Sequence, residues 1–477
     1  MKPAARFPGP APKVGLVSLG CAKNLLDSEV MAGVLTSRGF EMTADPADAD
    51  ALVVNTCGFI GPAKEEGINT ILELARLKSH GRCRRLVVAG CLAQRYASEL
   101  AREIPEIDAV IGLDEVERIA DVLIASERRT PPLRADQSVT WLYDHTTPRI
   151  RSTPPHIAYI KVAEGCDYPC SFCVIPQIRG RFRSRDPDSV LAEAASLAAT
   201  GTRELVLVAQ DTTAYGKDLG IRNGLARLLR ELAAVDGIGW VRFLYAYPTT
   251  LDDEVLSAMA EVPEVCRYVD IPLQHANRRV LRDMRRPGNR ESNERLLARI
   301  RGAVPGVAIR STFIVGFPGE TEDEFRELFD FVEAARFDAM GAFVYSNEES
   351  ATSHVEEEVI SESRKEDRRA RLMELQQGIA LARHREMVGS VVPVLVDGAA
   401  EESELLTAGR TEKQAPDVDA RVLIVDGDAP AGEFVDVEIT GAHPEDLVGK
   451  ALGAPALPAG PVLPGIRGEN RKHAPPA

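Results

Sequence analysis

The chain alternates short apolar runs with helical patterns, and this alternation restricts it to the α/β class of folds. Three runs near the N-terminus, at 14–21, 51–57 and 85–91, are rich in β-branched residues and each ends in a cysteine. Such runs are typical of buried parallel strands, and the segments between them carry apolar residues at helical spacing. Residues 13–125 are therefore predicted to form an open α/β domain.

Cys21, Cys57 and Cys91 close these three runs. Ligands of an open parallel sheet bind beyond the carboxyl ends of its strands, so thiols that are distant in sequence are expected to converge at one edge. The alternative is three unrelated buried cysteines, because free cysteine is among the most buried residue types. Cys83 and Cys266 do not share this placement and are interpreted as structural.

A second series of strand-like runs follows residues 126–156, a proline-rich stretch that is interpreted as a linker. Six runs alternate with helical segments up to residue 344, and the pattern favours a partial (β/α)6 barrel of the TIM type within 157–385. The last part of this region, 361–385, is predicted to be a long charged helix that acts as a solvated connector. The chemistry is expected at the loops that follow the strands.

The loop after the first run of this series contains Cys166, Cys170 and Cys173, separated by three and then two residues. Cysteine thiolates are the standard ligands of iron–sulfur clusters, and this spacing allows one loop to hold a cluster. Three ligands leave one iron of a four-iron cluster open to a substrate or cofactor. Zinc is the alternative, but a structural zinc site has four ligands and the loop offers no fourth cysteine or histidine.

Other polar residues and a glycine turn follow later strands on the same predicted face. Gln210 and Asp211 come after the second run, and Gly316, Gly319 and Glu320 come after the fifth. Glycines in such a turn allow the backbone to approach a ligand closely. The active site is therefore expected at this face of the barrel.

Residues 386–452 carry short alternating strands and are predicted to form a small antiparallel β-barrel, followed by a flexible Pro-, Gly- and Ala-rich tail at 453–477. The predicted barrel has 15 acidic and four basic residues, in a chain with a formal net charge of −15. Because phosphate contacts need Lys and Arg, this surface is expected to repel RNA and attract a basic protein. An acidic surface that serves only solubility is the alternative.

The chain shows no signal-peptide pattern and no run of about 18 apolar residues such as a membrane helix needs. A cytoplasmic location without membrane contact is expected, where cysteines stay reduced.

Several segments together resemble the radical S-adenosylmethionine (SAM) methylthiotransferase family. The cysteine loop GCDYPCSFC has the CxxxCxxC pattern of radical SAM enzymes, with the aromatic Phe172 before its last cysteine. Within this family, the chain resembles the branch that modifies an aspartate of ribosomal protein S-twelve. The resemblance lies in the segments SLGCAKNLLDSE, VNTCGFI, AEGCDYPCSFCVIPQIRGRFRSR, DIPLQHAN and FIVGFPGETE. The tRNA-modifying branch typically carries Gln-Met-Asn after the first cysteine and QSGS in place of Gln274–Asn277.

The resemblance implies two [4Fe-4S] clusters, with SAM as both methyl donor and radical source. The first cluster would be held by Cys21, Cys57 and Cys91, and the second, which binds SAM, by Cys166, Cys170 and Cys173. The SAM pocket would be lined by Phe172, Gln210, Asp211, Gly316, Gly319 and Glu320. The C-terminal part would be a TRAM barrel, and the product 3-methylthioaspartate.

The resemblance also implies two partners, the basic ribosomal protein S-twelve, free or in the small subunit and bound through the acidic barrel, and a one-electron reductase or flavodoxin. Two other functions remain open from the sequence. One is methylthiolation of a tRNA adenosine by the same chemistry. The other is a non-enzymatic iron–sulfur scaffold or RNA-associated docking protein.

Overall fold

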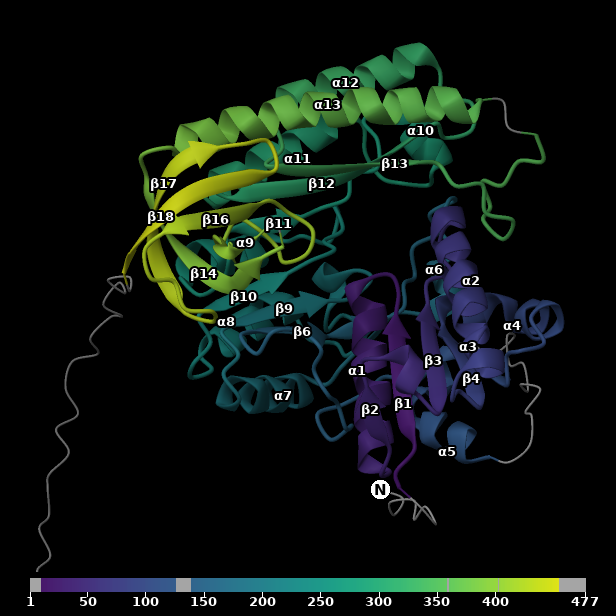
Figure 1. Cartoon of the computed structure of the whole chain (residues 1–477). Helices are drawn as coiled ribbons and strands as arrows, with labels where there is room; N and C mark the ends of the chain where they lie inside the picture. The colour runs from purple at the N-terminus through teal and green to yellow at the C-terminus, as the bar shows by residue number, and fades with distance from the viewer. Residues whose placement is uncertain (1–9, 126–138, 358–359, 402, 454–477) are drawn as a thin grey trace, which may run out of the picture.

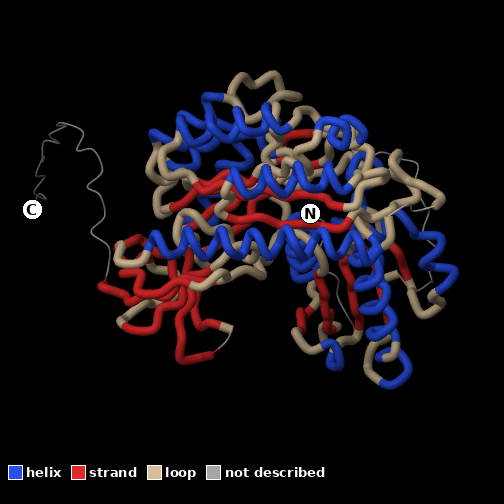
Figure 2. The backbone as a smooth tube through the Cα atoms, turned by 90° about the horizontal axis from the view of Figure 1, so that it is seen from above, coloured by secondary structure: helices blue, strands red, loops and turns tan. Residues whose placement is uncertain are grey.

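The computed structural model describes residues 10–125, 139–357, 360–401 and 403–453 of the chain. Figure 1 shows an N-terminal α/β part in purple and blue, a central part in teal and green, and a small C-terminal barrel in yellow. Viewed from above, the N-terminal sheet and the small barrel lie at opposite ends of the central part (Figure 2). The predicted tail beyond residue 453 and residues 126–138 of the predicted linker lie outside the described residues.

The N-terminal part is the open parallel sheet that the sequence predicts, with strand order β2-β1-β3-β4-β5. Its strands are β1 (Lys13–Ser18), β2 (Glu41–Thr43), β3 (Ala51–Thr56), β4 (Arg85–Gly90) and β5 (Ala109–Val110). Its helices are α1 (Ala22–Ser37), α2 (Gly61–Ala75), α3 (Leu77–His80), α4 (Cys91–Glu103) and α5 (Ile119–Ile124). The chain leaves β1 toward β2 and later returns to β3 on the other side of β1, so the strand order reverses between β1 and β3. Ligands of open α/β sheets bind at such a switch point.

The central part is the partial barrel predicted from the second series of runs. Its six parallel strands are β6 (Ile157–Lys161), β9 (Glu204–Val208), β10 (Trp240–Phe243), β11 (Tyr268–Asp270), β12 (Ala308–Val315) and β13 (Ala339–Val344). They pair as β10-β9-β6 and β11-β12-β13, and a parallel bridge between Val241 and Val265 joins the two halves. The strands therefore run in sequence order from β6 to β13.

Helices cover the outside of this barrel. They are α7 (Pro187–Ala199), α8 (Gly224–Ala233), α9 (Asp253–Glu261), α10 (Arg278–Asp283), α11 (Arg290–Ala303) and α12 (Glu322–Ala335). A short hairpin and helix follow the first strand: β7 (Ala163–Glu164), α6 (Ile175–Arg179) and β8 (Arg183–Ser184). The inner barrel face packs against both ends of the molecule, because Tyr159 and Tyr268 share one apolar cluster with Leu26 of α1 and Leu395 of the small barrel.

Residues 139–156 of the predicted linker run closely along the N-terminal part. Glu29 of α1 pairs with Arg149 and accepts hydrogen bonds from the amide and hydroxyl of Ser152. Gly33 allows this approach, because a Cβ there would lie 2.4 Å from the backbone of Pro148. The segment thereby fixes α1 beside the barrel.

Helix α13 (Glu362–Met387) packs on the barrel and is more than the solvated connector expected from its charge. Leu372 and Ile379 belong to the main barrel core, and the guanidinium of Arg368 is buried against Glu320. A few well-placed side chains anchor a helix whose composition is mostly charged. Neither this helix nor any other in the described part of the chain is long and apolar enough to cross a membrane.

The C-terminal part is a closed five-stranded barrel with the order β14-β15-β16-β18-β17. Its strands are β14 (Val391–Ala400), β15 (Ser403–Arg410), β16 (Arg421–Asp426), β17 (Phe434–Ala442) and β18 (Asp446–Gly453). The sequence predicted an antiparallel barrel, but β16 and β18 pair in parallel, so the barrel is mixed. Two consecutive hairpins would give only antiparallel pairs, whereas closure here brings β18 between β17 and β16.

Candidate functional site

The first thiol triplet lies at the carboxyl edge of the N-terminal sheet. Cys21 precedes α1, Cys57 follows β3 and Cys91 begins α4 directly after β4. The approach of Cys21 to Cys57 requires Gly20, whose φ is +93° and whose Cβ would lie 2.8 Å from the Cβ of Cys57. Burial, together with the neighbouring Cys21 and Cys57, raises the pKa of Cys91 to about 11 against the opposing charge of Arg179. The three thiols therefore lie within electrostatic reach of one another.

The second thiol triplet lies in the loop after β7. Two backbone hydrogen bonds shape it, from the Cys173 amide to the Cys170 carbonyl and from the Cys166 amide to the Gly180 carbonyl, each 3.1 Å long. Burial and the nearby thiols of the loop together raise the pKa of Cys166 to about 11 and that of Cys173 to about 12. The triplet is local in sequence and compact in space.

Both triplets offer the donors that an iron–sulfur cluster requires. Burial raises the pKa of the thiols of Cys57, Cys91, Cys166 and Cys173, so these four stay protonated until a metal binds and displaces the proton. The pKa of Cys21 is lowered instead, because the charges of Lys23 and Arg179 outweigh its burial. In the residues that the structure describes, no three Cys, His, Asp or Glu side chains are grouped as the ligands of a single metal ion. Cysteines on a four-iron cluster each bind a different iron.

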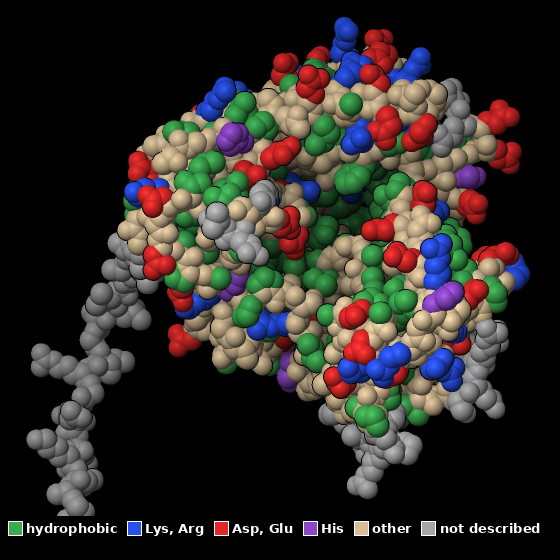
Figure 3. Space-filling view, in the orientation of Figure 1, with side chains coloured by type: hydrophobic (Ala, Val, Ile, Leu, Met, Phe, Trp, Pro, Cys, Tyr) green, Lys and Arg blue, Asp and Glu red, His purple; other side chains and the backbone are tan. Residues whose placement is uncertain are grey.

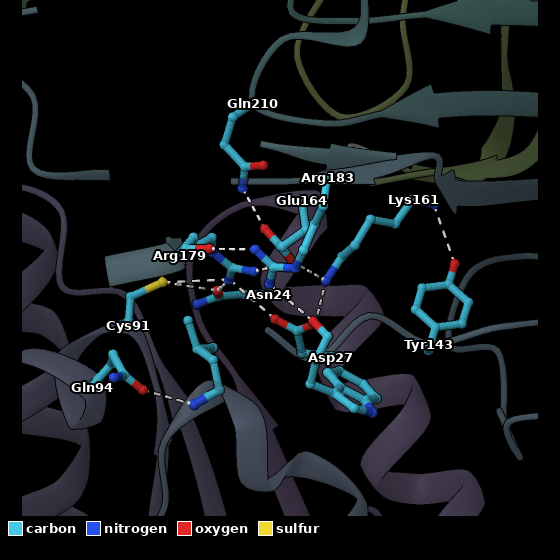
Figure 4. Close-up of polar contacts among 12 residues, drawn as sticks. Asn24, Asp27, Cys91, Gln94, Tyr143, Lys161, Glu164, Arg179, Arg183 and Gln210 are labelled. Carbon is cyan, nitrogen blue, oxygen red and sulfur yellow. Dashed lines mark hydrogen bonds and ion pairs between the residues drawn. The ribbon is translucent and has the colours of Figure 1, made fainter. Parts of the chain in front are cut away.

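A buried network of charges connects Cys91 of the first triplet with Glu164, which lies two residues before Cys166 of the second, and Arg179 of α6 is at its centre (Figure 4). Its guanidinium donates to Glu164 at 2.9 Å, to Asp27 at 3.0 Å and to the side-chain oxygen of Asn24 at 2.6 Å. The same guanidinium is 3.4 Å from the Cys91 sulfur. The ammonium of Lys161 pairs with Asp27 and Glu164 on the other side. Helix α6 directly follows the cysteine loop, so one side chain spans from the barrel loop to the first triplet.

Away from Arg179, a second set of contacts joins the N-terminal part to the loop that follows the last strand of the barrel. Glu348, in the loop after β13, pairs with Lys64 at 2.8 Å and with Arg95 at 2.9 Å. The hydroxyl of Ser346 accepts a hydrogen bond from the Gly61 amide at the start of α2. Figure 3 shows that the molecule is hollowed between the N-terminal part and the barrel. The carboxyl edge of each sheet therefore faces the other.

Three family models match this arrangement in order along the chain. Residues 13–112 match the uncharacterized protein family UPF0004, residues 160–332 the radical SAM superfamily and residues 388–452 the TRAM domain. The first two matches cover the two thiol triplets, and the third covers the small barrel. The radical SAM match agrees with the CxxxCxxC loop and the open barrel.

Relatives of similar length extend the match over almost the whole chain. A protein of Solibacter usitatus described as "Ribosomal protein uS12 methylthiotransferase RimO" is 49% identical over 460 residues, covering 94% of this chain and 98% of its own. The chain belongs to the RimO family. A RimO of Anaeromyxobacter sp. is 47% identical over 94% of this chain and 97% of its own, and one of Geobacter sulfurreducens is 46% identical over 92% and 98%. The resemblance inferred from the sequence motifs is confirmed, including the branch of the family.

Solved structures support the fold of this RimO-family chain. The radical SAM methyltransferase TsrM of Kitasatospora setae, with tryptophan and a SAM analogue bound, superposes with a TM-score of 0.53 at 19% identity. The match covers 82% of this chain and 79% of that one. The likeness concerns the fold alone.

The residues predicted to line a SAM pocket in this RimO-family chain form two groups, one near the cysteine loop and one in the glycine turn after β12. Phe172, Gln210 and Asp211 make up the first group. Phe172 packs with Val280, Met284 and Tyr345, beside the cysteine loop. Gln210 donates to Glu164 at 2.6 Å, while its amide oxygen has no partner among the described residues. Asp211 accepts hydrogen bonds from the hydroxyls of Tyr168 at 2.8 Å and Thr213 at 2.5 Å. The Asp211 carboxylate thus holds the cysteine loop through Tyr168.

The glycine turn after β12 is built around Glu320. Its carboxylate accepts hydrogen bonds from the amides of Gly316 and Phe317, at 2.6 and 3.1 Å. It also pairs with Arg368 of α13 at 3.0 Å. Gly316 and Gly319 have φ values of +74° and +76°, a region that favours glycine. Glu320 therefore stabilises the turn, and the turn presents its backbone to the site.

Other residues contact the site besides those predicted to bind a cluster or SAM, and Tyr247 and His275 are among those expected after the strands of the barrel. Tyr247 stacks on Tyr168 with ring centroids 3.6 Å apart, and the guanidinium of Arg286 lies over Tyr247 and 3.9 Å from the Cys170 sulfur. Arg179 was not predicted, although its place in the segment IPQIRG, right after the cysteine loop, could have indicated a residue close to the site. His275 is fully buried, and burial lowers its pKa to about 3, so it is neutral at neutral pH.

Proposed function

We propose that this chain is a radical SAM methylthiotransferase that converts an aspartate of ribosomal protein uS12 to 3-methylthioaspartate. The observation that carries the proposal is the pair of thiol triplets on two facing sheet edges, with Arg179, from the helix after the cysteine loop, in contact with Cys91 of the first triplet. Cys21, Cys57 and Cys91 would hold one [4Fe-4S] cluster, and Cys166, Cys170 and Cys173 a second that binds SAM. When bound, these groups supply the methylthio group and the radical chemistry that an unactivated C–H bond requires.

The side chains around the site support chemistry without a general base. A C–H bond at an aspartate β-carbon has no acidic proton, so no carboxylate or imidazole is needed to remove one. The carboxylates of Asp211 and Glu320 are engaged in hydrogen bonds within the protein, and His275 is buried and neutral. The residues of the site hold ligands and exclude water rather than transfer protons.

A SAM pocket beside the second triplet is supported by groups with free capacity. The amide oxygen of Gln210, the backbone of the Gly316–Gly319 turn and the ring of Phe172 border the cysteine loop. Glu320 and Asp211 would act indirectly, by fixing the turn and the loop. An aromatic ring and backbone groups are suited to an adenine and to the methionine portion of SAM.

The acidic barrel supports uS12, a basic protein, as the partner. Glu401, Asp428 and Glu445 are exposed on it, whereas Asp397 and Asp419 are used internally, in pairs with Arg410 and Arg310. Complementary charge would steer the partner to the enzyme. A reductase or flavodoxin would supply electrons, and the enzyme would work in the cytoplasm, where uS12 is made.

In the proposed function, each domain predicted from the sequence has a separate role. We assign residues 13–125 to the first cluster, 157–385 to SAM and the second cluster, and 386–452 to the partner, with 126–156 as the connection. The separate apolar cores of the sheet, the large barrel and the small barrel support these bounds.

Anaerobic reconstitution with iron, sulfide, a reductant and SAM tests the function. With purified uS12 as substrate, the protein should gain the mass of one methylthio group and 5′-deoxyadenosine should accumulate. In cells that lack the gene, uS12 should lack the mass of this methylthio group. Unchanged uS12 together with altered tRNA nucleosides would contradict the proposal.

A further inference from the structure

Lys23 is a buried cation without a carboxylate partner in the described part of the chain. Its side chain is in the second position of α1, and the residue is only 8% exposed. The other buried lysines, Lys161 and Lys365, each pair with a carboxylate. The Lys23 ammonium instead lies 3.3 Å from the ring centroid of Tyr245. A buried ammonium is costly without an anion. The phenol of Tyr245 and the thiol of Cys21 face this ammonium and neither is a carboxylate, so the position is suited to a further, anionic partner.

Lys23 connects the N-terminal part, next to the first triplet, with the barrel loop that contacts the second triplet. Lys23 follows Cys21 by two residues, and Tyr245 follows β10 on the barrel side. Two residues further on, Tyr247 stacks on Tyr168 of the cysteine loop. The ammonium therefore contacts, on the barrel side, the same loop that holds Tyr247 against the cysteine loop.

The backbone of Tyr245 is strained in a way that keeps its ring under the ammonium. Tyr245 has a φ of +64°, unusual for a residue with a bulky side chain. Its amide donates to Asp270 at 3.0 Å, which holds this conformation. Strain of this kind is concentrated at functional sites, where surrounding structure maintains it.

The environment of Lys23 favours a small anion with oxygen acceptors. An ammonium offers three donors, and the N-terminus of α1, a helix with no acidic residue in its first turn, adds positive potential. Tyr245 and the apolar residues Ala22 and Leu25 share one cluster beside it, so water competes weakly. A carboxylate fits this combination of a buried cation and an aromatic wall.

We propose that Lys23 binds the side-chain carboxylate of the substrate aspartate and places its β-carbon between the two triplets. This inference rests on the proposed function. The carboxylate of SAM has the same chemistry, and the experiment must separate the two sources.

The test compares uS12 with a uS12 variant in which the target aspartate is asparagine, each titrated against reconstituted enzyme. Wild-type enzyme should bind the aspartate form about 10- to 100-fold more tightly, the range expected for a charge-assisted hydrogen bond. Lys23→Met should bind both forms equally, and Lys23→Arg should recover part of the preference. Lys217→Met, at an exposed lysine, should behave as wild type.

Three further readouts separate the possible failures. Iron content, the affinity for SAM and formation of 5′-deoxyadenosine should be the same in Lys23→Met as in wild type. A preserved preference for aspartate in Lys23→Met, or a weakened SAM affinity, would overturn the inference. If wild-type enzyme forms no methylthioaspartate, the proposed function fails as well; if it forms the product and the Lys23→Met preference is intact, only the role of Lys23 fails.

Discussion

The two thiol triplets are held by different means. Cys166, Cys170 and Cys173 lie within eight residues of one loop and are shaped by local backbone hydrogen bonds. Cys21, Cys57 and Cys91 come from three separate strand ends and meet only when the sheet has formed. Arg179, from the barrel, contacts a thiol of the N-terminal triplet. The first triplet thus depends on both the N-terminal sheet and the barrel, whereas the contacts described above for the second triplet, from Asp211, Tyr247 and Arg286, come from the barrel alone.

The largest expected effect is on product formation, and it distinguishes the functions of the two triplets. Cys170→Ala should abolish formation of 5′-deoxyadenosine from SAM, because the loop then lacks a ligand for its cluster. Cys57→Ala should keep this cleavage and lose methylthioaspartate. Anaerobic assays that quantify both products by mass spectrometry check the result. Equal loss of SAM cleavage in both variants would remove the functional difference between the triplets.

The next effect concerns the dependence of the first triplet on the barrel. Arg179→Met leaves Asp27 and Glu164 buried with Lys161 as their one remaining ion-pair partner among the described residues. Breaking a buried ion-pair network in this way should lower the free energy of unfolding by about 3–5 kcal/mol. Urea unfolding followed by circular dichroism measures it.

Arg181→Met is the matched control for Arg179→Met. The Arg181 side chain is 89% exposed and its contact with Asp167 is 3.5 Å long, so its loss should have almost no effect. Equal stability of the Arg179 variant and this control would show that the network does not join the two parts.

A smaller effect, on the barrel side, is the pH dependence that His275 gives to stability. Its pKa is about 3 in the folded protein because of burial, against about 6.5 in an unfolded chain. Between these values the unfolded chain binds the proton and the folded protein does not, so the free energy of unfolding decreases as pH falls from 6.5 toward 3. His275→Gln should flatten this decrease, measured as urea midpoints at pH 6.5 and 4.5. The exposed His80 gives the control, and a slope that is unchanged in His275→Gln would contradict the assignment.

The smallest effect tests how local the second triplet is. Tyr168→Phe removes one hydrogen bond to Asp211, whose carboxylate still accepts from Thr213 and Thr250. The loss should be about 1 kcal/mol, with the ring stack on Tyr247 retained. Thermal unfolding of the apoprotein, with Tyr168→Leu as the variant that also loses the stack, measures it. A loss as large as that of Arg179→Met would show that the loop depends on distant structure after all.

Periodicity predicted the fold because each strand carries a continuous apolar run. The open sheet, the six-stranded barrel and the small barrel all follow from this signal. Parallel pairing of β16 and β18 did not follow, since strand patterning records burial and not the direction of the neighbouring strand. The buried role of α13 was missed for a related reason: only a few positions of a charged helix, such as Leu372, enter the core.

The candidate site was predicted in part. The cysteines were visible because they sit in a fixed spacing or at strand ends. The partners that organise them come from other elements: Arg179 reaches Cys91, Lys23 reaches Tyr245, and Tyr247 reaches Tyr168. Contacts of this kind depend on how the N-terminal part is placed on the barrel, and no local pattern encodes that placement.

Iron content of cysteine variants tests the central claim, two separate clusters, most directly. Wild-type protein reconstituted anaerobically should bind about eight iron atoms, and a protein lacking either triplet should bind about four. The two triple variants are Cys21→Ala with Cys57→Ala and Cys91→Ala, and Cys166→Ala with Cys170→Ala and Cys173→Ala. Retention of about eight iron atoms in either folded variant, or loss of all iron in the variant without the N-terminal triplet, would contradict the account.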